Sequence, residues 1–482
     1  MSNVITSTIT SVSVSNASGD SLSETALASL NYPEAPLIRT AIPGPRALDH
    51  LERARQVESM ARGAGGFPFV FAAGRGSTVK DADGNIAIDV SAGVAVNAVG
   101  RCHPRVVAAM KAQMDVLMHA SDMSSTHRTA LAEKVAAVMP PGLRDNCVTC
   151  FTQSGSNAAE TALKFIRALT GRGQIVAFHG AYHGVSTGCG SLTTGERYHK
   201  KNLHIPGVIH VPYPYSYRCP FGTRTQEECE EMCANYLDYV LNTPYTGADD
   251  VAAVIVEPIQ GEGGYVPPSA EFFRRVKAAC EKHGALFVAD EVQAGAGRSG
   301  KMWAIEYSGV EPDVLLWGKG MGGDVAMAGC TFRRDLALKI GEGSHPNTFA
   351  ANGVSAAACM TNIDIITENN GALLDRVATV GREIVERLRA AIPSAPWIGE
   401  VRGRGFMIGI ELVANPDTRE PLPPETVSRI VMKMLARGII LVPCGRHGNV
   451  LRFMPPLTIT RALVNTACDT LLECLREVSA GR

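Results

Sequence analysis

The sequence predicts an α/β protein with a large lobe built on a mostly parallel, doubly wound sheet and a smaller α+β lobe formed by both ends of the chain. Three observations predict this class. Short apolar runs alternate with helical patterns through the middle of the chain, as strands and crossover helices do in a parallel sheet. The 482 residues exceed what one hydrophobic core usually holds, so we expect two lobes. The 48 glycines fit a globular fold with many tight turns.

The composition excludes several other classes of protein. Hydrophobic residues make up 45% of the chain, which argues against a disordered or fibrous protein. The formal net charge of -1 gives no reason to expect a nucleic acid or an anionic membrane as a partner. No apolar run approaches the length of a membrane span, so we expect no membrane association.

The 13 cysteines indicate a reducing compartment. Their number is odd and most lie in apolar segments, so we expect free thiols in a cytoplasmic protein. Cys147 and Cys150 form a CxxC pattern, but in a predicted buried strand packing is the simpler interpretation. Cys219, Cys229 and Cys233 approach zinc-ligand spacing without the second half of such a motif. We therefore predict no metal site.

The first 97 residues are predicted to form a tail and then part of the small domain. Residues 1–30 are rich in Ser, Thr, Asn and Ala and contain no Lys or Arg, which indicates a flexible tail and neither a mitochondrial presequence nor a secretory signal. In residues 31–97, four prolines predict an extended arm, after which residues 46–62 have a helical pattern. Residues 74–89 alternate around an Asp-Gly-Asn turn, which predicts an antiparallel hairpin.

Residues 98–344 are predicted to form the large domain. A helical pattern after Pro104 leads into it, and strands then alternate with helices in the order of a doubly wound sheet. The expected strands are 147–152, 174–178, 251–257, 285–290 and 314–318, and the clearest helices are 158–169 and 270–282.

Residues 345–482 are predicted to complete the small domain. Two long helical patterns are followed by strand-like segments and by a closing helix from Thr460. The helical patterns cover 353–368 and 372–391, and the strand-like segments cover 406–412, 439–442 and 450–453.

Two of the expected strands end in charged residues of opposite sign. The strand 285–290 leads to Asp290 and Glu291, and the strand 314–318 leads to Lys319. Ligands of open α/β sheets bind outside the carboxyl ends of the strands, so these groups are placed for chemistry. A lysine that forms a Schiff base and a carboxylate that keeps a pyridine nitrogen protonated are what pyridoxal phosphate (PLP) chemistry needs.

Other strand ends carry weaker signals with two interpretations each. Gly155 and Ser156 open a helix, where they could bind a phosphate, although the turn could simply cap the helix. Tyr182 could stack on a planar ring or belong to the core. Glu257 and Glu262 flank a Gly-rich loop and could bind or gate a charged substrate, although such acids are usually solvated.

Arg452 lies inside an apolar strand near the end of the chain. A buried guanidinium needs an anion, which a substrate carboxylate would supply through two parallel hydrogen bonds. A structural ion pair is the alternative interpretation.

Together these motifs resemble the class III, fold-type I PLP-dependent aminotransferases. The order SGS, YHG, EPIQGEGG, DEVQAGAGRSG, GKG and then a late Thr and Arg matches the family from about Pro43 to the end of the chain. The resemblance implies that Lys319 forms the Schiff base and shuttles the proton, and that Asp290 pairs with the pyridinium nitrogen. It also implies that Val292 and Tyr182 pack on the two faces of the ring, and that Gln293 binds the ring hydroxyl.

The resemblance implies further roles at the ends of the cofactor and the substrate. Gly155 and Ser156 are similar to the phosphate ligands, and Thr348 is similar to a threonine contributed across a dimer interface. We therefore expect a homodimer with shared active sites. Glu262 and Arg452 match a switch pair, in which the glutamate covers the arginine for one substrate and frees it to bind the carboxylate of another.

These roles imply transfer of an amino group from an amino acid or ω-amino acid to a 2-oxo acid such as 2-oxoglutarate or pyruvate, with ping-pong kinetics. The family's 4-aminobutyrate enzymes typically carry YHGR, but Val185 stands at the arginine position, which favours a smaller or less polar donor. Asn157, Asp324 and Ala326 also depart from the usual motifs and affect the expected loop geometry.

A second function stays open. Residues 211–218 resemble an amino-acid and amino-lactam racemase branch of the same family, which performs the same first proton removal. In that branch Asp often replaces the equivalent of Glu262, and the lactam enzymes lack the late arginine, so Glu262 and Arg452 favour the transferase. Decarboxylating transamination is a third possibility on this scaffold. A dinucleotide-dependent dehydrogenase is excluded because no GxGxxG follows the first strand of a βαβ unit.

Overall fold

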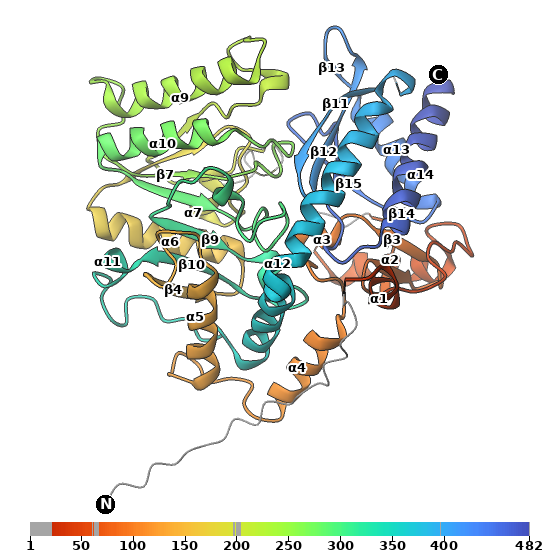
Figure 1. The fold of residues 1–482 in the computed structure, drawn as a ribbon, viewed down its shortest axis with the longest axis horizontal. Helices are drawn as coiled ribbons and strands as arrows, with labels where there is room; N and C mark the ends of the chain where they lie inside the picture. Colours follow the sequence, from red (N-terminus) through yellow and green to blue (C-terminus); the bar gives the residue numbers. More distant parts are fainter. Residues whose placement is uncertain are drawn as a thin grey trace, which may run out of the picture.

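The computed structural model describes residues 22–59, 61, 67–195, 198, 204–395 and 397–481. The chain folds into two lobes (Figure 1). The green and yellow middle of the chain forms the larger lobe, while red N-terminal and blue C-terminal segments lie side by side in the smaller one (Figure 1). The predicted α/β class, with a small lobe built from both ends, is confirmed.

A seven-stranded sheet forms the centre of the large lobe. All five predicted strands are present, and two further strands, β6 and β10, join them. Neighbouring strands are parallel except at β10, which is antiparallel to both of its neighbours. Across the sheet the order is β4 (Cys147–Thr152), β10 (Ala328–Arg333), β9 (Val314–Trp317), β8 (Leu286–Asp290), β7 (Val251–Val256), β5 (Gln174–Phe178) and β6 (Val208–Val211).

Helices cover both faces of this sheet. On β5, Ile175 and Ala177 pack in the apolar cluster that contains α6, whereas Val176 and Phe178 pack in the cluster that contains α9 and α10. Burial on both faces explains why these strands read as continuous apolar runs in the sequence. The helices of the large lobe are α4 (Pro104–Met114), α5 (Thr126–Val138), α6 (Gly155–Thr170), α7 (Thr187–Leu192), α9 (Gln226–Asn242), α10 (Ala270–His283) and α11 (Arg334–Ala337).

Two smaller sheets form the second lobe. In the first sheet, the N-terminal strands β2 and β3 form the antiparallel hairpin, and β3 also pairs in parallel with the C-terminal strand β14. The first sheet contains β1 (Phe71–Arg75), β2 (Thr78–Asp81), β3 (Ile86–Asp89) and β14 (Ile439–Ile440). The second contains β11 (Ile398–Arg404), β12 (Met407–Asn415), β16 (Val450–Phe453), β15 (Val442–Cys444) and, paired with β12, β13 (Glu420–Pro421).

The small lobe is covered by long helices, and α12 connects it to the large lobe (Figure 1). Asn369, Asn370 and Gly371 adopt positive φ values within α12, which explains why the sequence reads as two helices. The remaining helices are α2 (Pro45–Val57), α3 (Ala92–Ala95), α12 (Gly353–Ala390), α13 (Pro424–Ala436) and α14 (Arg461–Ala480).

The tail predicted over residues 1–30 needs correction in its last third. Residues 1–21 lie outside the described residues, but α1 (Glu24–Ser29) is a folded helix. Ser23 caps it by accepting a hydrogen bond from the Ala26 N–H, and Leu27 is buried. Glu24 forms an ion pair with Arg376 of α12. The short helix is therefore attached to the body of the protein.

Helix α2 ends at Val57, before the predicted end at residue 62. Glu58 already has extended backbone angles, and residues 60 and 62–66 lie outside the described residues. Within the described part of the chain, no helix is both long enough and apolar enough to cross a membrane.

Candidate active site

Lys319 and Asp290 lie together at the carboxyl edge of the central sheet. Strands β8 and β9 are parallel neighbours, and Asp290 is paired in register with Leu316. Asp290 ends β8, while Lys319 follows β9 in a tight turn with a φ of 40°. Both side chains line one cavity of about 300 Å³. The sheet topology thus brings the predicted acid and amine to the same space.

Asp290 is held by a buried histidine. Its Oδ2 lies 2.6 Å from His183 Nδ1, and its Oδ1 accepts a hydrogen bond from the Val292 N–H at 3.0 Å. Burial disfavours a charged His183, but the hydrogen bond and the charge of Asp290, together with Glu257, leave the pKa of His183 raised. A protonated His183 would place a positive charge directly against the carboxylate of Asp290. Sequence analysis did not select His183, whose only signal was its place next to Tyr182.

The amine of Lys319 faces the cavity without a fixed partner. Among the described residues, no hydrogen bond or ion pair engages its Nζ atom. Burial lowers the pKa of Lys319, and this effect outweighs the negative charges of Glu262 and Asp290. A lowered pKa makes the neutral, nucleophilic amine more accessible near neutral pH.

One wall of the cavity is the N-terminus of α6. The side chain of Ser154 caps the helix by accepting from the Asn157 N–H at 3.2 Å, so the capping role falls to Ser154. The N–H groups of Gly155 and Ser156 belong to the first turn, where no intrahelical acceptor exists. A Cβ atom on Gly155 would lie 2.6 Å from Val292, so only glycine fits there. The wall therefore exposes backbone donors at the positive end of a helix dipole.

Three further predicted residues line the same cavity. Tyr182 and Val292 contribute side chains, and Gln293 accepts a hydrogen bond from the Tyr265 hydroxyl at 2.7 Å. The Tyr182 ring is supported edge to face by Tyr198, with centroids 5.1 Å apart. An aromatic ring, a branched aliphatic side chain and an amide are groups that can contact a flat heterocycle.

Glu257 also lines this cavity and is buried. Its Oε1 accepts a hydrogen bond from the Gly261 N–H at 3.2 Å, which ties it to the following loop. Burial raises the pKa of Glu257 to about 7, with the positive His183 opposing and the negative Asp290 adding to the shift. Glu257 is thus a carboxyl group whose charge can change near neutral pH.

Glu262 and Arg452 form an ion pair beside the cavity. Arg452 lies on β16, and its side chain also donates to the Pro443 carbonyl at 3.1 Å, while its Nε is buried without a hydrogen-bond partner. Glu262 lines an outer cavity of about 770 Å³. Tyr182 lines both cavities, so it marks the boundary between them.

Thr348 and Val185 line neither cavity in the described chain, and neither does Arg452, which reaches the outer cavity only through its ion pair with Glu262. Thr348 is exposed, and its carbonyl oxygen lies 2.8 Å from Nε2 of His119. Val185 is also exposed on the surface. A single chain therefore brings the other predicted site residues to these cavities or, for Arg452, to the carboxylate of Glu262, but leaves Thr348 outside.

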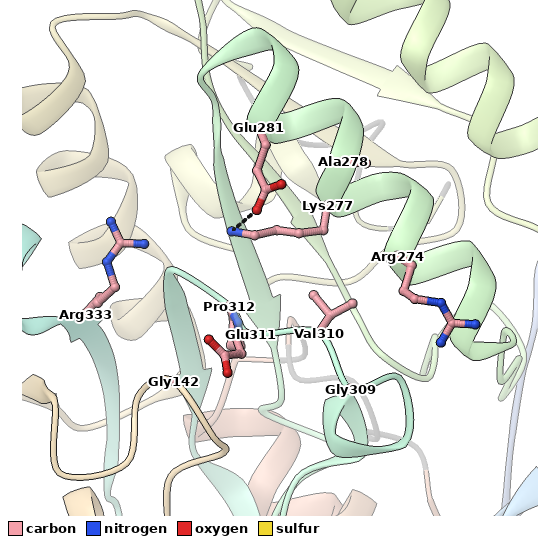
Figure 2. A pocket seen from close by; sticks show the side chains of 10 residues that line it. All are labelled: Gly142, Arg274, Lys277, Ala278, Glu281, Gly309, Val310, Glu311, Pro312 and Arg333. Carbon is pink, nitrogen blue, oxygen red and sulfur yellow. Dashed lines mark ion pairs between the residues drawn. The ribbon is translucent and has the colours of Figure 1, made fainter.

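A third cavity, of about 400 Å³, lies at the opposite, amino end of β9 and is also rich in charge (Figure 2). Its cations already form ion pairs: Lys277 pairs with Glu281 and Asp313, and Arg333 pairs with Asp313. No group of three or more His, Cys, Asp or Glu side chains that could hold a metal ion is found among the described residues.

The cavity at Lys319 fits PLP. It offers an amine without a fixed partner among the described residues, a carboxylate hydrogen-bonded to a histidine, and backbone donors at a helix N-terminus for a phosphate. Because residue 155 is glycine, no side chain fills the space between the start of α6 and Val292. The donor set thus matches the aldehyde, ring nitrogen and phosphate of the cofactor.

Comparisons with known proteins give consistent similarities. The family described as Aminotransferase class-III matches residues 59–475. The alanine/serine racemase of Pyrococcus horikoshii is 36% identical over 93% of this chain and 94% of its own length. The diaminobutyrate–2-oxoglutarate aminotransferase of Rhizobium meliloti is also 36% identical, over 88% of this chain and 91% of its own length.

Solved structures extend the similarity to three dimensions. A PLP-bound amine transaminase from an uncultivated Pseudomonas species has a TM-score of 0.79 and 30% identity, covering 88% of this chain and 97% of that structure. An aminotransferase from Bacillus anthracis has a TM-score of 0.81 and 27% identity, covering 90% and 99%. Both similarities span the two lobes.

Proposed function

The chain belongs to the class III aminotransferases, which are PLP-dependent transaminases, and from this premise we propose that it moves an amino group from an amino acid or ω-amino acid to a 2-oxo acid such as 2-oxoglutarate or pyruvate. The observation that carries the proposal is the Glu262–Arg452 pair beside the cavity of Lys319. A transaminase binds two different substrates in one site in turn. A carboxylate that can cover or release an arginine suits this task.

Each cofactor contact in the proposal is assigned to a residue of the cavity. Gly155 and Ser156 would hold the phosphate, Asp290 the ring nitrogen and Gln293 the ring hydroxyl, while Val292 and Tyr182 would pack against the ring. When bound, PLP supplies an electrophilic aldehyde and a pyridinium ring that withdraws electrons from the substrate.

The chain's own groups handle the proton and the charges. Lys319 removes the proton from Cα of the substrate, because its lowered pKa leaves part of the amine neutral. Asp290 keeps the ring nitrogen protonated, and His183 positions Asp290 through the 2.6 Å contact. Glu257 and Glu262 contribute negative charge where an amino donor enters.

Amino-acid racemization is the second candidate function. A named racemase is as similar to this chain as a named diaminobutyrate aminotransferase is, at 36% identity each. An isoleucine 2-epimerase and a leucine/methionine racemase are both 34% identical. Racemases remove the same Cα proton but return it to Cα, so the same lysine and carboxylate would serve both reactions.

A single-turnover experiment separates these functions. Holoenzyme is mixed with individual amino donors and no 2-oxo acid, and the products are analysed by mass spectrometry. A transaminase releases the oxo product of the donor, a 2-oxo acid from an α-amino acid or an aldehyde from an ω-amino acid, at most one equivalent per active site. A racemase releases none, while the amino acid loses optical purity and exchanges its α-proton with deuterated solvent. The second outcome would contradict the proposed transamination.

We also propose that the enzyme is a cytoplasmic homodimer in which Thr348 completes the partner's site. Thr348 lies beside Phe349, whose exposed ring packs 5.0 Å from the ring of His119. Leu117, Met118 and other nearby side chains are exposed as well, and such apolar surface suggests an interface. A second copy of the chain is the expected occupant.

Hybrid dimers test this arrangement. Lys319→Ala and Thr348→Ala chains are purified as separate weak variants and then mixed under conditions that exchange subunits. If Thr348 serves the partner, each hybrid contains one site with both Lys319 and Thr348 intact, so activity recovers on mixing. Light scattering must also give twice the mass of the chain. A monomer, or a mixture that stays inactive after exchange, would contradict the shared site.

A further inference from the structure

The outer cavity contains a cation, Arg446, that forms no ion pair with a carboxylate among the described residues. Arg446 lines this cavity with Glu262 and Tyr182, in the turn between β15 and β16. Within the described chain, Arg446 has no ion pair, and its Nη2 donates only a long hydrogen bond, 3.4 Å, to the His179 carbonyl. The neighbouring Glu262 already pairs with Arg452. Among the described residues that line the cavity, the one carboxylate is therefore already engaged by Arg452, and Arg446 is left without an ion-pair partner.

The geometry fixes Arg446 close to the switch pair. The N–H of Gly445 donates to the carbonyl of Glu262 at 2.8 Å, which ties the turn that carries Arg446 to the loop that carries Glu262. On its other side, the guanidinium of Arg446 lies 5.5 Å from the centroid of the Tyr215 ring. Tyr215 is itself buried and bound to Glu411 and Arg402. Arg446 thus rests on a rigid support.

The two arginines differ in their distance from the reacting centre. Arg452 affects the pKa of Lys319, so its charge is felt at the reacting amine. Arg446 lines only the outer cavity, beyond Tyr182. His179, the nearest titratable neighbour on this wall, has its pKa lowered by burial and by Arg446 itself, so it stays neutral and does not compete for an anion.

We propose that Arg446 binds the distal carboxylate of a dicarboxylic substrate, and that the preferred 2-oxo acid is therefore a five-carbon diacid of the 2-oxoglutarate type. This inference rests on the proposed transamination. Once Glu262 moves aside, Arg452 is free for the carboxylate next to the reacting carbon. The second carboxylate then points outward, where an unpaired, planar guanidinium can bind it through two hydrogen bonds. A monocarboxylic acid such as pyruvate leaves Arg446 unused.

The test compares acids with one and two carboxylates on the Arg446→Ala, Arg446→Lys and wild-type holoenzymes. With 2-oxoglutarate, Arg446→Ala raises KM roughly 10- to 100-fold with little change in kcat, because a charge-assisted contact is lost. KM for pyruvate changes less than about twofold because pyruvate does not reach Arg446. Arg446→Lys keeps the positive charge but loses the planar pair of N–H donors, so its KM for 2-oxoglutarate lies between those of wild type and Arg446→Ala. Arg274→Ala, an arginine at the third cavity, is the matched control and behaves as wild type.

Binding of unreactive acids separates this proposal from the proposed reaction. Calorimetry on holoenzyme measures glutarate, with two carboxylates, against butyrate, with one. Wild type binds glutarate more tightly, and Arg446→Ala removes the difference. If this binding pattern is found but the single-turnover experiment detects no oxo product, the proposed transamination is contradicted and the role of Arg446 in binding diacids is not. Equal binding of the two acids by wild type, or equal losses with pyruvate and 2-oxoglutarate in a folded Arg446→Ala, would overturn the role of Arg446.

Discussion

The two ends of the central sheet carry charged cavities that differ in how their charges are paired. At the amino end, Lys277 Nζ lies 2.9 Å from Asp313 Oδ2, and each cation labelled in Figure 2 forms an ion pair with a carboxylate, of which the figure draws only Lys277–Glu281. At the carboxyl end, Lys319 has no such partner among the described residues. Charge in a pocket is therefore a weak indicator of function. A half-buried charged group without a direct partner is a stronger one, because the nearby carboxylates only partly offset the cost of its burial.

The lysines of the two cavities give the largest expected contrast. Lys319→Ala should reduce turnover by about 1000-fold or more, because it removes both the nucleophile and the base. Lys277→Ala should leave turnover within about twofold but lower the free energy of unfolding by about 1 to 3 kcal/mol, because Asp313 loses a charged partner. Steady-state kinetics and denaturant unfolding measure the two quantities.

The visible absorbance of bound PLP provides a control for the Lys319 variant. The wild type and Lys277→Ala should retain it after dialysis, whereas Lys319→Ala should lose it. A Lys319→Ala enzyme with full turnover would show that the unpaired lysine is not the reacting amine. Equal losses in both variants would remove the contrast between the cavities.

The aspartates of the two cavities give the next contrast. Asp290→Asn keeps the size of the side chain but removes the charge opposite His183, and turnover should fall roughly 100- to 1000-fold. Asp313→Asn should act on stability and leave turnover nearly unchanged, because the contacts of the Asp313 side chain are the ion pairs with Lys277 and Arg333 and a hydrogen bond from the Phe287 N–H, all at the amino end of the sheet. Turnover and melting temperature are measured for both. If Asp290→Asn loses stability but keeps its turnover, Asp290 has a structural role, as Asp313 does.

Glu291, which follows Asp290 at the end of β8, should make the stability of the protein depend on pH. It is buried, its Oε1 accepts from the Ile305 N–H at 2.7 Å, and its Oε2 has no hydrogen-bond partner. Burial raises the pKa of Glu291 to about 8. The folded state therefore keeps a proton that the unfolded state loses near pH 4.5, so this contribution to stability is full at low pH and is lost as the pH rises through about 8.

Glu291→Gln should remove that dependence. Between pH 6 and 8, this carboxyl group contributes a fall of about 2 to 3 kcal/mol in the free energy of unfolding, and the neutral amide contributes none. Melting temperatures across this range measure the slope. The exposed Glu281→Gln serves as the control and should keep the wild-type slope. An unchanged slope in Glu291→Gln would mean that Glu291 is ionised in the folded protein.

Sequence reasoning located the strands because burial on both faces leaves a clear apolar signature, and β4 and β5 were predicted to the residue. It missed β6 and β10. Strand β10 contains Gly329 and Thr331 and inserts antiparallel between β4 and β9, an order that no local pattern contains. The α1 helix was also missed, because its six residues carry little pattern and the contacts that attach it, such as the ion pair of Glu24 with Arg376, join positions far apart in the sequence.

The site was predictable to the extent that strand ends coincide with motifs. Lys319, Asp290 and the Gly155 turn were identified because each directly follows a recognisable strand. The pairing state of a charge was not predictable, since it depends on side chains that are distant in sequence. His183 at Asp290 and the unpaired Arg446 appear only once the chain is folded.

The smallest expected effect concerns two Glu–Arg pairs that differ only in burial. In the Glu262–Arg452 pair the side chains are 21% and 7% exposed, whereas in the Glu271–Arg274 pair they are 61% and 55% exposed. Glu262→Gln should raise KM for ω-amino donors about 10-fold, because Arg452 stays buried and charged without its cover, a loss of about 1.4 kcal/mol. KM for 2-oxo acids should stay equal or fall, since Arg452 no longer has to be released.

Glu271→Gln removes the same charge from an exposed pair and should change neither KM, because such pairs contribute about 0 to 1 kcal/mol and lie outside the substrate cavities. Initial rates with each substrate varied in turn measure both variants. Equal changes for donor and 2-oxo acid in Glu262→Gln would make the pair a structural bridge like those at the amino end. A donor-specific change would mean that the fold holds this one carboxylate ready to leave its arginine.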